Sequence, residues 1–323
     1  MQIYSKACVA TLWLAVCACE IVEEDDEPVE ISTAEQEGMN LQGMNLQGFQ
    51  LGNATLSGVA LQNLRVERGE LVAERNGKTL RGRALEGALL RAVVRDEGAS
   101  PPTTVLVTYR IDKIRPELSQ HDPTNTGSTH LYTIEQWVPE SSAWRPACSP
   151  DADGRRAAIP LAAIWDERGA RIESSSLFTL ACTTGVIAKC YRWGYRPWVT
   201  GYGDLAAMHW TCTRLARADY CGNGVPHTQD GTWINIWDTL PAPGPIQHHG
   251  TPPPTMVFEA GWNTGGAVCL GHTRWMRNGA AIAAMCPERL IRPGIGPLVC
   301  NSLGEALLID PSTKMFNESY LQP

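Results

Sequence analysis

The stretch CTRLARADYCGNGVPHTQDG, residues 212–231, places two cysteines, an aspartate and a histidine within twenty residues. At about 100° per residue, Met208, Cys212 and Leu215 fall on one helical face, which predicts an amphipathic helix that buries Cys212. We expect this helix to run through Tyr220 and to end at a left-handed glycine of the GNG turn that follows.

The helical spacing limits how the two cysteines of this stretch can pair. Cys212 and Cys221 would lie about 13 Å apart along a helix that rises about 1.5 Å per residue. A disulfide needs Cα atoms within about 7 Å, so we expect each cysteine to cross to another element. Cys190 is the favoured partner of Cys212, because that bridge would join two consecutive helical segments.

Asp219 would lie on the inner face of this helix, close to its end. The helix macrodipole disfavours a negative charge there, and a buried carboxylate without a partner is costly. We therefore expect an arginine or the amides of the GNG turn to compensate Asp219.

A catalytic site and a metal site are the alternatives to this structural interpretation. Cys221 and His227 could form a nucleophilic dyad with Asp219 nearby, since a thiolate needs a base within hydrogen-bond reach. A zinc site would combine four side chains that can ligate the metal, namely His209, Cys212, Cys221 and His227. These residues lack the Cys-x2-Cys knuckle of many zinc sites. An oxidising compartment competes for both thiols, so we predict neither a metal nor a cofactor.

The cysteine count indicates such a compartment. Of 11 cysteines, Cys8 and Cys17 fall in a predicted signal and Cys19 in a predicted lipid-attachment motif. The other eight lie between residues 148 and 300, which predicts four disulfides and leaves 105 pairings open. These eight are Cys148, Cys182, Cys190, Cys212, Cys221, Cys269, Cys286 and Cys300.

The N-terminus is predicted to direct export. Residues 1–19 contain an apolar segment, Ala7 to Ala18, that is too short to span about 30 Å of hydrocarbon. They end in VCAC, which resembles a bacterial lipobox with Cys19 as the lipidated residue, and an ordinary cleaved signal is the alternative. Residues 20–37 carry nine carboxylates and no Lys or Arg, as expected of an extended tether. Glu20 points to the outer membrane by analogy with characterised lipoproteins.

Charge outside the tether argues against nucleic-acid binding. The chain has 27 Lys and Arg against 34 Asp and Glu. Without Lys6 and the nine tether acids, 26 basic and 25 acidic residues remain. No basic stripe or arginine-rich helix is concentrated enough to suit a polyanion.

Residues 38–64 repeat with a period of five, with leucine at 41, 46, 51, 56 and 61. This pattern resembles the pentapeptide repeat, whose units build the square coils of a right-handed β-helix. One coil cannot bury its own face and needs capping, and a low-complexity linker is the alternative. Residues 65–136 alternate β-branched and polar side chains between Gly and Pro, which predicts a β-rich region.

Tryptophan is concentrated in one part of the chain, because ten of the 11 lie between Trp137 and Trp275. Such residues fill the interior of a disulfide-rich domain or form a surface that binds sugars or peptides. Core packing is favoured. Trp193, Tyr195 and Trp198, in the segment YRWGYRPW, are the members that we expect to be exposed.

Three segments carry a resemblance to a known family: AKCYRWGYRPW, CTRLARADYCGNGVPHTQDGTWINIWD and FEAGWNTGGAVCLGHTRW. They are similar to the ADYC domain, a family of exported proteins and lipoproteins. The family takes its name from the tetrapeptide that stands here as Ala218, Asp219, Tyr220 and Cys221. The resemblance covers residues from about 137 to 300, and it implies export but no established activity.

The sequence thus predicts an α+β protein, with a mainly β N-terminal region followed by a disulfide-rich domain, residues 137–323, of two helices and short strands. We expect an exported outer-membrane lipoprotein, on the periplasmic face or the cell surface, held to the membrane by its lipid. It would act as a non-enzymatic binding or structural module, with an envelope glycan or protein as ligand. An envelope hydrolase or transferase that uses Cys221 and His227 is the alternative.

Overall fold

The computed structural model describes residues 49–96, 103–117, 129–166, 168–229, 232–241, 246, 255–274 and 279–321. These residues belong to one compact unit. The predicted signal and lipid site (1–19), the acidic tether (20–37) and the first part of the repeat (38–48) lie outside them. No helix in the described ranges is long and apolar enough to cross a membrane.

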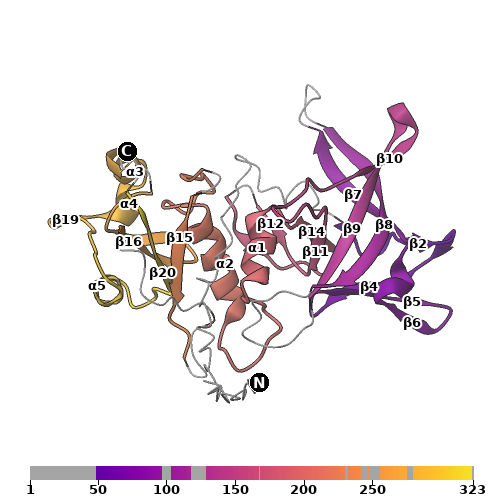
Figure 1. Cartoon of the computed structure of the whole chain (residues 1–323), viewed down its shortest axis with the longest axis horizontal. Coiled ribbons are helices and arrows are strands. Elements are labelled where there is room, and N and C mark those ends of the chain that lie inside the picture. The colour runs from indigo at the N-terminus through magenta and orange to yellow at the C-terminus, as the bar shows by residue number, and fades with distance from the viewer. Residues whose placement is uncertain are drawn as a thin grey trace, which may run out of the picture. The chain divides into compact units, whose positions relative to one another are not determined.

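The N-terminal half is built on a nine-stranded antiparallel sheet, coloured indigo to magenta in Figure 1. The sheet closes on itself because β1 pairs with both β14 and β7, with Phe49 opposite Phe178 and Ala92. The closed ring consists of β1 (Phe49–Gln50), β14 (Leu177–Cys182), β11 (Ala158–Leu161), β9 (His130–Val138), β8 (Thr103–Pro116) and β7 (Leu89–Asp96). Outside the ring, β10 (Ala143–Pro146) pairs with β9, and the hairpin β2 (Thr55–Leu56) and β3 (Val59–Ala60) pairs with β7.

Aromatic side chains fill the inside of the closed sheet. The Phe49 ring lies 5.0 Å from Tyr109 and 5.1 Å from Phe178, and all three side chains are buried. A three-stranded sheet packs against this core and consists of β4 (Gln62–Glu67), β5 (Glu70–Arg75) and β6 (Lys78–Arg81). The backbone N–H of Leu71 donates to Tyr132 Oη at 2.9 Å, which ties β5 to β9.

The leucine repeat does not form a coil of a β-helix in its described part, residues 49–64. Strands β2 and β3 form an antiparallel hairpin there, with Thr55 opposite Ala60. Leu61 is buried and Leu56 is half-buried in the core of the closed sheet. The leucines of the repeat, which are separated by short turns, thus contribute apolar side chains to this core.

Helix α1 (Val186–Arg192) lies between two cores. Ile187 and Tyr191 pack with Ile159 and Ala181, which point outward from the closed sheet. Cys190, on the other side of the helix, packs in the core of the C-terminal half. Apolar residues on both sides of this short helix explain why six of its seven residues are buried.

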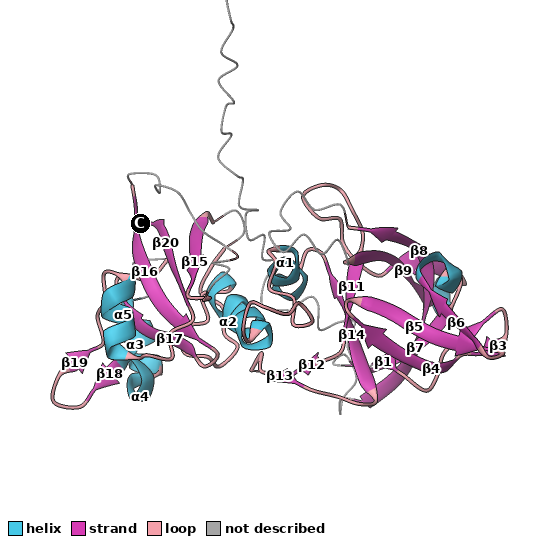
Figure 2. Ribbon diagram, turned by 90° about the horizontal axis from the view of Figure 1, so that it is seen from below, coloured by secondary structure: helices cyan, strands magenta, loops and turns pink. Residues whose placement is uncertain are grey.

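The C-terminal half contains a four-stranded antiparallel sheet with helices on both faces (Figure 2). Its order is β15 (Ile234–Asp238), β20 (Met315–Tyr320), β16 (Met256–Asn263) and β17 (Gly266–Leu270). Helix α2 (Leu205–Ala216) packs on one face through Met208 and Leu215. Helix α5 (Leu303–Ile309) covers the other face at β16 and β17, where Ala306 lies against Gly261.

Shorter elements complete the described chain. They are a 3-10 turn at Gly82–Leu85 and another at Pro139–Ser141, the pair β12 (Ile164–Trp165) and β13 (Arg171–Ile172), α3 (Gly279–Met285), α4 (Pro287–Leu290), and the pair β18 (Ile291–Arg292) and β19 (Gly296–Pro297). The fold is α+β as predicted, with five α-helices rather than two in the described residues. Strand β9 crosses the predicted boundary between residues 136 and 137.

Candidate functional site

The ADYC tetrapeptide forms a compact turn directly after α2. The helix ends at Ala216, four residues earlier than predicted, and Ala218 then takes a left-handed conformation with φ of 50°. The N–H of Ala218 donates to Leu215 O (3.0 Å), and the N–H of Asp219 donates to Arg214 O (2.9 Å). The prediction that a glycine of the GNG turn ends the helix was therefore wrong.

Asp219 is fully buried in this turn, beyond the helix rather than on its inner face. Its Oδ2 forms an ion pair with Arg214 Nη1 and accepts a hydrogen bond from the N–H of Gly224 (3.0 Å). Its Oδ1 accepts from the N–H of Asn223 (3.1 Å). The predicted compensation, by an arginine and by the amides of the GNG turn, is confirmed. Both oxygens hold the turn closed, which is a structural role.

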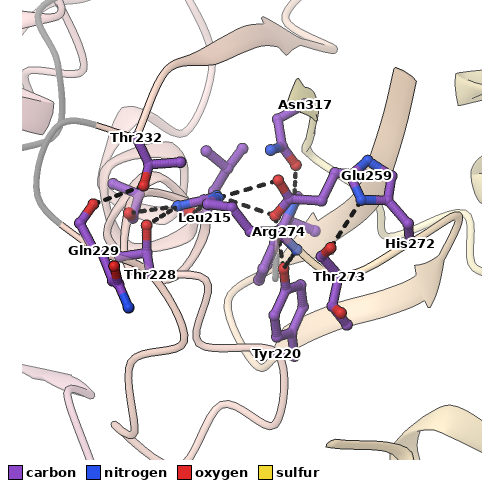
Figure 3. Close-up of polar contacts among 12 residues, drawn as sticks. Leu215, Tyr220, Thr228, Gln229, Thr232, Glu259, His272, Thr273, Arg274 and Asn317 are labelled. Atoms are coloured by element: carbon purple, nitrogen blue, oxygen red, sulfur yellow. Dashed lines mark hydrogen bonds and ion pairs between the residues drawn. The ribbon is translucent and has the colours of Figure 1, made fainter. Parts of the chain in front are cut away.

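Tyr220 points away from the turn into the core of the C-terminal half (Figure 3). Its hydroxyl donates to Glu259 Oε1 (2.9 Å) and accepts from the backbone N–H of Arg274 (2.7 Å). Its ring stacks on Trp262 at 5.2 Å, and its backbone carbonyl accepts from the N–H of Ala267 (2.9 Å). Burial raises the pKa of Tyr220 well above its usual value, so this hydroxyl stays protonated and keeps its donor role.

Arg274 and Glu259 form a fully buried ion pair at the centre of Figure 3. Nε and Nη2 of Arg274 donate to the two carboxylate oxygens at 3.1 and 3.0 Å. Nη2 also donates to Leu215 O, and Nη1 to Ala216 O and Thr228 Oγ1, at 2.9 to 3.1 Å. All five N–H donors of the guanidinium are thus used, and two of them cap the last carbonyls of α2.

The charge state of Glu259 follows from this pairing. Burial alone would raise the pKa of the Glu259 carboxyl, but the charge and hydrogen bonds of Arg274, with a contribution from Ser319, lower it below its usual value. The pair therefore remains ionised while fully excluded from water. A buried pair with complete hydrogen bonding holds a fold in one arrangement, and the loss of either partner leaves an isolated charge.

Cys221 cannot act as a thiol nucleophile, because it forms a disulfide with Cys286, 65 residues further along the chain. His227 is half-buried, and its backbone N–H donates to Arg217 O at 3.0 Å. Burial lowers the pKa of His227, and the charge of Asp219 opposes that shift. The predicted dyad of Cys221 and His227 is contradicted, since the sulfur that a base would activate is already bonded.

Removing the Cys221–Cys286 disulfide should lower the free energy of unfolding by about 2–4 kcal/mol, because the unfolded chain gains the freedom of a long loop. The double variant Cys221→Ser, Cys286→Ser tests this by chemical denaturation. His227→Ala is the control and should melt close to the wild type. A catalytic role for Cys221 would be supported instead if both variants kept the wild-type stability and shared one loss of biological function.

The remaining cysteines form three further disulfides. Cys190 pairs with Cys212, with a Cα separation of 5.9 Å, so the pair favoured from the sequence is confirmed and α1 is tied to α2. The other bridges are Cys148–Cys182 and Cys269–Cys300. All eight predicted cysteines are thus paired, which fits an exported protein and leaves neither Cys212 nor Cys221 as a zinc ligand.

His209, the remaining histidine of the zinc alternative, lies inside the protein. Its Nε2 lies 3.0 Å from Ile187 O, which favours the tautomer with the proton on Nε2. Its ring packs edge-on against Tyr191 at 4.3 Å. Burial lowers the pKa of His209 to about 3, so the ring is neutral at ordinary pH. It serves the packing of α2 against α1.

Glycines let the ADYC turn approach the β16–β17 hairpin at backbone distance. A Cβ added to Gly222 would lie 1.7 Å from Gly265 O, and Gly222 has φ of +67°. A Cβ added to Gly266 would lie 2.6 Å from Tyr220 O. The glycines on both sides of this contact therefore have a packing role, whereas the sequence analysis gave the glycines of the GNG turn only a role in ending the helix.

The aromatic residues expected on the surface are mostly inside. Tyr195 is fully buried and donates its hydroxyl to Asp238 Oδ2 (3.0 Å), and Trp193 is 6% exposed. Trp198 is half-buried, 5.3 Å from the Tyr191 ring, and it packs over Gly69. The prediction that these three side chains form a binding surface was wrong, because they fill space around α1.

Glu259 and Arg274 were not recognised from the sequence as partners of the ADYC motif. Glu259 is a single carboxylate in an otherwise apolar strand, MVFEAGWN, which is the signal that could have found it. A charged side chain among residues that alternate into a core needs an opposite charge within the fold. Its partner lies 15 residues away, after the hairpin of β16 and β17.

The comparisons with known proteins add one match. A protein-family model described as ADYC domain matches residues 82–276. This range starts earlier than residue 137 and ends before residue 300, so it contains part of the closed sheet and the whole of the turn described above. No curated protein and no solved structure matches the chain.

Proposed function

The chain belongs to the ADYC domain family, and we propose that it is an exported, non-enzymatic binding or structural module of the cell envelope. The observation that carries this proposal is that the side chains of the motif are already bonded to partners within the fold. Asp219 closes a turn, Tyr220 bonds the buried ion pair and Cys221 forms a disulfide. Groups that must change protonation or attack a substrate need free atoms, whereas these groups have fold-stabilising partners.

Attachment to the outer membrane through lipid on Cys19 is part of this proposal. The VCAC segment supports it, together with the run of carboxylates in residues 20–37, which suits a solvated tether between lipid and fold. Glu20 after the cysteine supports the outer rather than the inner membrane. The even number of bonded cysteines agrees with passage through a compartment that oxidises thiols.

Replacing Cys19 with Ser should move the protein from the membrane fraction to the soluble exported fraction, because a thioether-linked lipid can no longer form. Fractionation with a fatty-acid label measures both location and lipidation. Cys17→Ser is the matched control and should leave both unchanged. Lipid attachment would be contradicted if Cys19→Ser stayed in the membrane fraction and the wild type took up no label. The protein would then associate with the envelope in another way.

A further inference from the structure

The strand that closes the N-terminal sheet is much shorter than its neighbours. β1 is described from Phe49, which lies opposite Phe178 of β14 and Ala92 of β7. Because both neighbours are antiparallel to β1, they run past it in the same direction, as Thr179–Cys182 in β14 and Val93–Asp96 in β7. We call these two strand edges, on the side of β1, the seam. No strand of the described chain pairs with β14 or β7 along the seam.

Backbone groups of β14 point into the seam. The N–H of Thr183 donates to Ala157 O at 2.8 Å, so every second residue of β14, counted back from Thr183, bonds to β11. Leu180 falls between these residues and lies opposite Pro160, which has no N–H to donate. The N–H and C=O of Leu180 therefore point to the side of β1.

These groups of Leu180 need a partner, because the residue is fully buried. Bulk water does not reach them, and nearly all buried backbone N–H and C=O groups in folded proteins are hydrogen-bonded. Among the described residues, neither a backbone nor a side-chain group bonds to Leu180 from the side of β1. The partner therefore belongs to a segment outside the described ranges.

The edge of β7 has the same need with the complementary alternation. The N–H of Ile111 donates to Ala88 O at 2.9 Å, so every second residue of β7, counted forward from Ala88, bonds to β8. The backbone groups of Ala92 thus point away from β1, and those of Val93 point into the seam. Successive residues of a strand bond to its two neighbours in turn, so one strand can satisfy both edges.

We infer that residues 45–48, which directly precede the described part of β1, fill the seam as a continuation of this strand. Counted back along the register of β1 with its two neighbours, Gln47 lies opposite Leu180 and Gly48 lies opposite Val93. Gln47 then exchanges both backbone hydrogen bonds with Leu180, and Gly48 does so with Val93. The existing register thus meets both alternations without a shift.

Chain continuity and composition favour these residues over other occupants. Residues 45–48 are joined to β1 without a loop, so no loop-closure entropy opposes their placement. Their sequence, NLQG, contains neither proline nor a charged side chain, so each residue has an N–H to donate. Residues 20–37 suit the seam poorly, because their nine carboxylates would be costly at a buried edge.

The inferred strand also limits how far the fold can lie from the membrane. With residues 45–48 held in the sheet, only residues 20–44 would separate the lipidated Cys19 from the fold. A chain of this length spans at most about 80–90 Å when fully extended. This limit rests on the proposed lipid attachment, whereas the strand itself does not.

Hydrogen–deuterium exchange of the full-length Cys19→Ser protein, read at single residues by mass spectrometry, tests the inference. The amides of Gln47 and Gly48 should exchange at least about tenfold more slowly than those of an unfolded chain, as should the amide of Leu180. Amides of residues 20–37 are the internal reference and should exchange at the unfolded rate. Exchange of Gln47 and Gly48 at that reference rate would overturn the inference, whether or not Leu180 is protected.

Light scattering on the same sample separates a strand of the same chain from a strand of a second copy. We expect the protected state in a monomer, at every protein concentration. Protection of Gln47 and Gly48 only in a dimer, with its loss on dilution to the monomer, would also overturn the inference, because the seam would then be filled by a partner chain.

A proline variant gives a second readout. Gln47→Pro removes the N–H that would bond to Leu180 and should speed exchange at Leu180 about tenfold. Thr33→Pro, in the acidic segment, is the matched control and should leave this exchange unchanged. If only Gln47→Pro fails to fold in melting experiments, residue 47 belongs to the fold, which supports the inference. Equal exchange at Leu180 in the wild type and both variants would contradict it.

Discussion

Arg274→Met should lower the free energy of unfolding by about 3–5 kcal/mol, which is the usual cost of leaving one member of a buried ion pair without its partner. Methionine fills much of the volume but donates no hydrogen bond. Glu259 would lose two charge-assisted bonds, and the carbonyls of Leu215 and Ala216 would lose their cap. Urea denaturation with the disulfides intact measures the change.

Arg292→Met is the control for this prediction, because the Arg292 side chain is exposed and, within the described residues, donates only to Ile309 O at 3.4 Å. It should change stability by less than about 0.5 kcal/mol. The pH dependence gives a second readout. The lowered pKa of Glu259 stabilises the wild type above about pH 4, and this contribution is lost as pH falls through the folded-state pKa. In Arg274→Met, burial without a counter-charge raises that pKa, so the contribution of this carboxyl should instead improve as pH falls.

Gly222→Ala should prevent stable folding, because its new Cβ would lie 1.7 Å from Gly265 O and 2.5 Å from the carbonyl carbon. Neither atom can move without shifting the β16–β17 hairpin that stacks against the ADYC turn. The left-handed backbone adds about 1–2 kcal/mol for a residue with a Cβ, and the overpacking adds about 1–3 kcal/mol or more. Yield of the exported protein and its melting temperature measure the effect.

Gly77→Ala separates the clash from the backbone cost. Gly77 has φ of +73°, close to that of Gly222, but nothing lies within 4 Å of an added Cβ. This variant should show only the backbone term of about 1–2 kcal/mol. Equal stability of the two variants would mean that the ADYC turn and the hairpin are not in backbone contact.

Helical spacing predicted part of the site correctly. It placed Cys212 in a core, and the pairing with Cys190 was favoured because that bridge joins two consecutive helical segments. A bridge to Cys221 was correctly excluded, although that argument assumed a helix through Tyr220 and α2 ends at Ala216. The need of Asp219 for an arginine and for turn amides also followed from the chemistry of a buried carboxylate. Local rules of this kind need no knowledge of distant segments.

The end of α2 could not be predicted in the same way. Ala218 takes a left-handed conformation that alanine seldom adopts. Asp219 is held by Arg214 and the turn amides, whereas Tyr220 is held by partners elsewhere in the fold. The partners of Tyr220 lie 39 and 54 residues away, at Glu259 and Arg274. Tertiary bonds therefore override the helical tendency of the sequence after Ala216.

The closed sheet and the burial of the aromatic residues were also beyond local patterns. Closure depends on Phe49 meeting Phe178 and Ala92, which no spacing within one segment reveals. Trp193 and Tyr195 were predicted to lie on the surface because arginines alternate with the aromatic residues in this segment. They are buried because α1 is covered on both sides. Alternation along a strand predicts which side chains share a face, but not which face another element covers.

Peptide mapping of the exported protein by mass spectrometry, without reduction and after alkylation of free thiols, tests most directly whether the ADYC motif is structural. We expect a linked peptide pair that joins Cys221 to Cys286, beside Cys148–Cys182, Cys190–Cys212 and Cys269–Cys300. An alkylated Cys221 in the folded, exported protein would contradict it, because a free thiol there would leave the motif without its covalent bond.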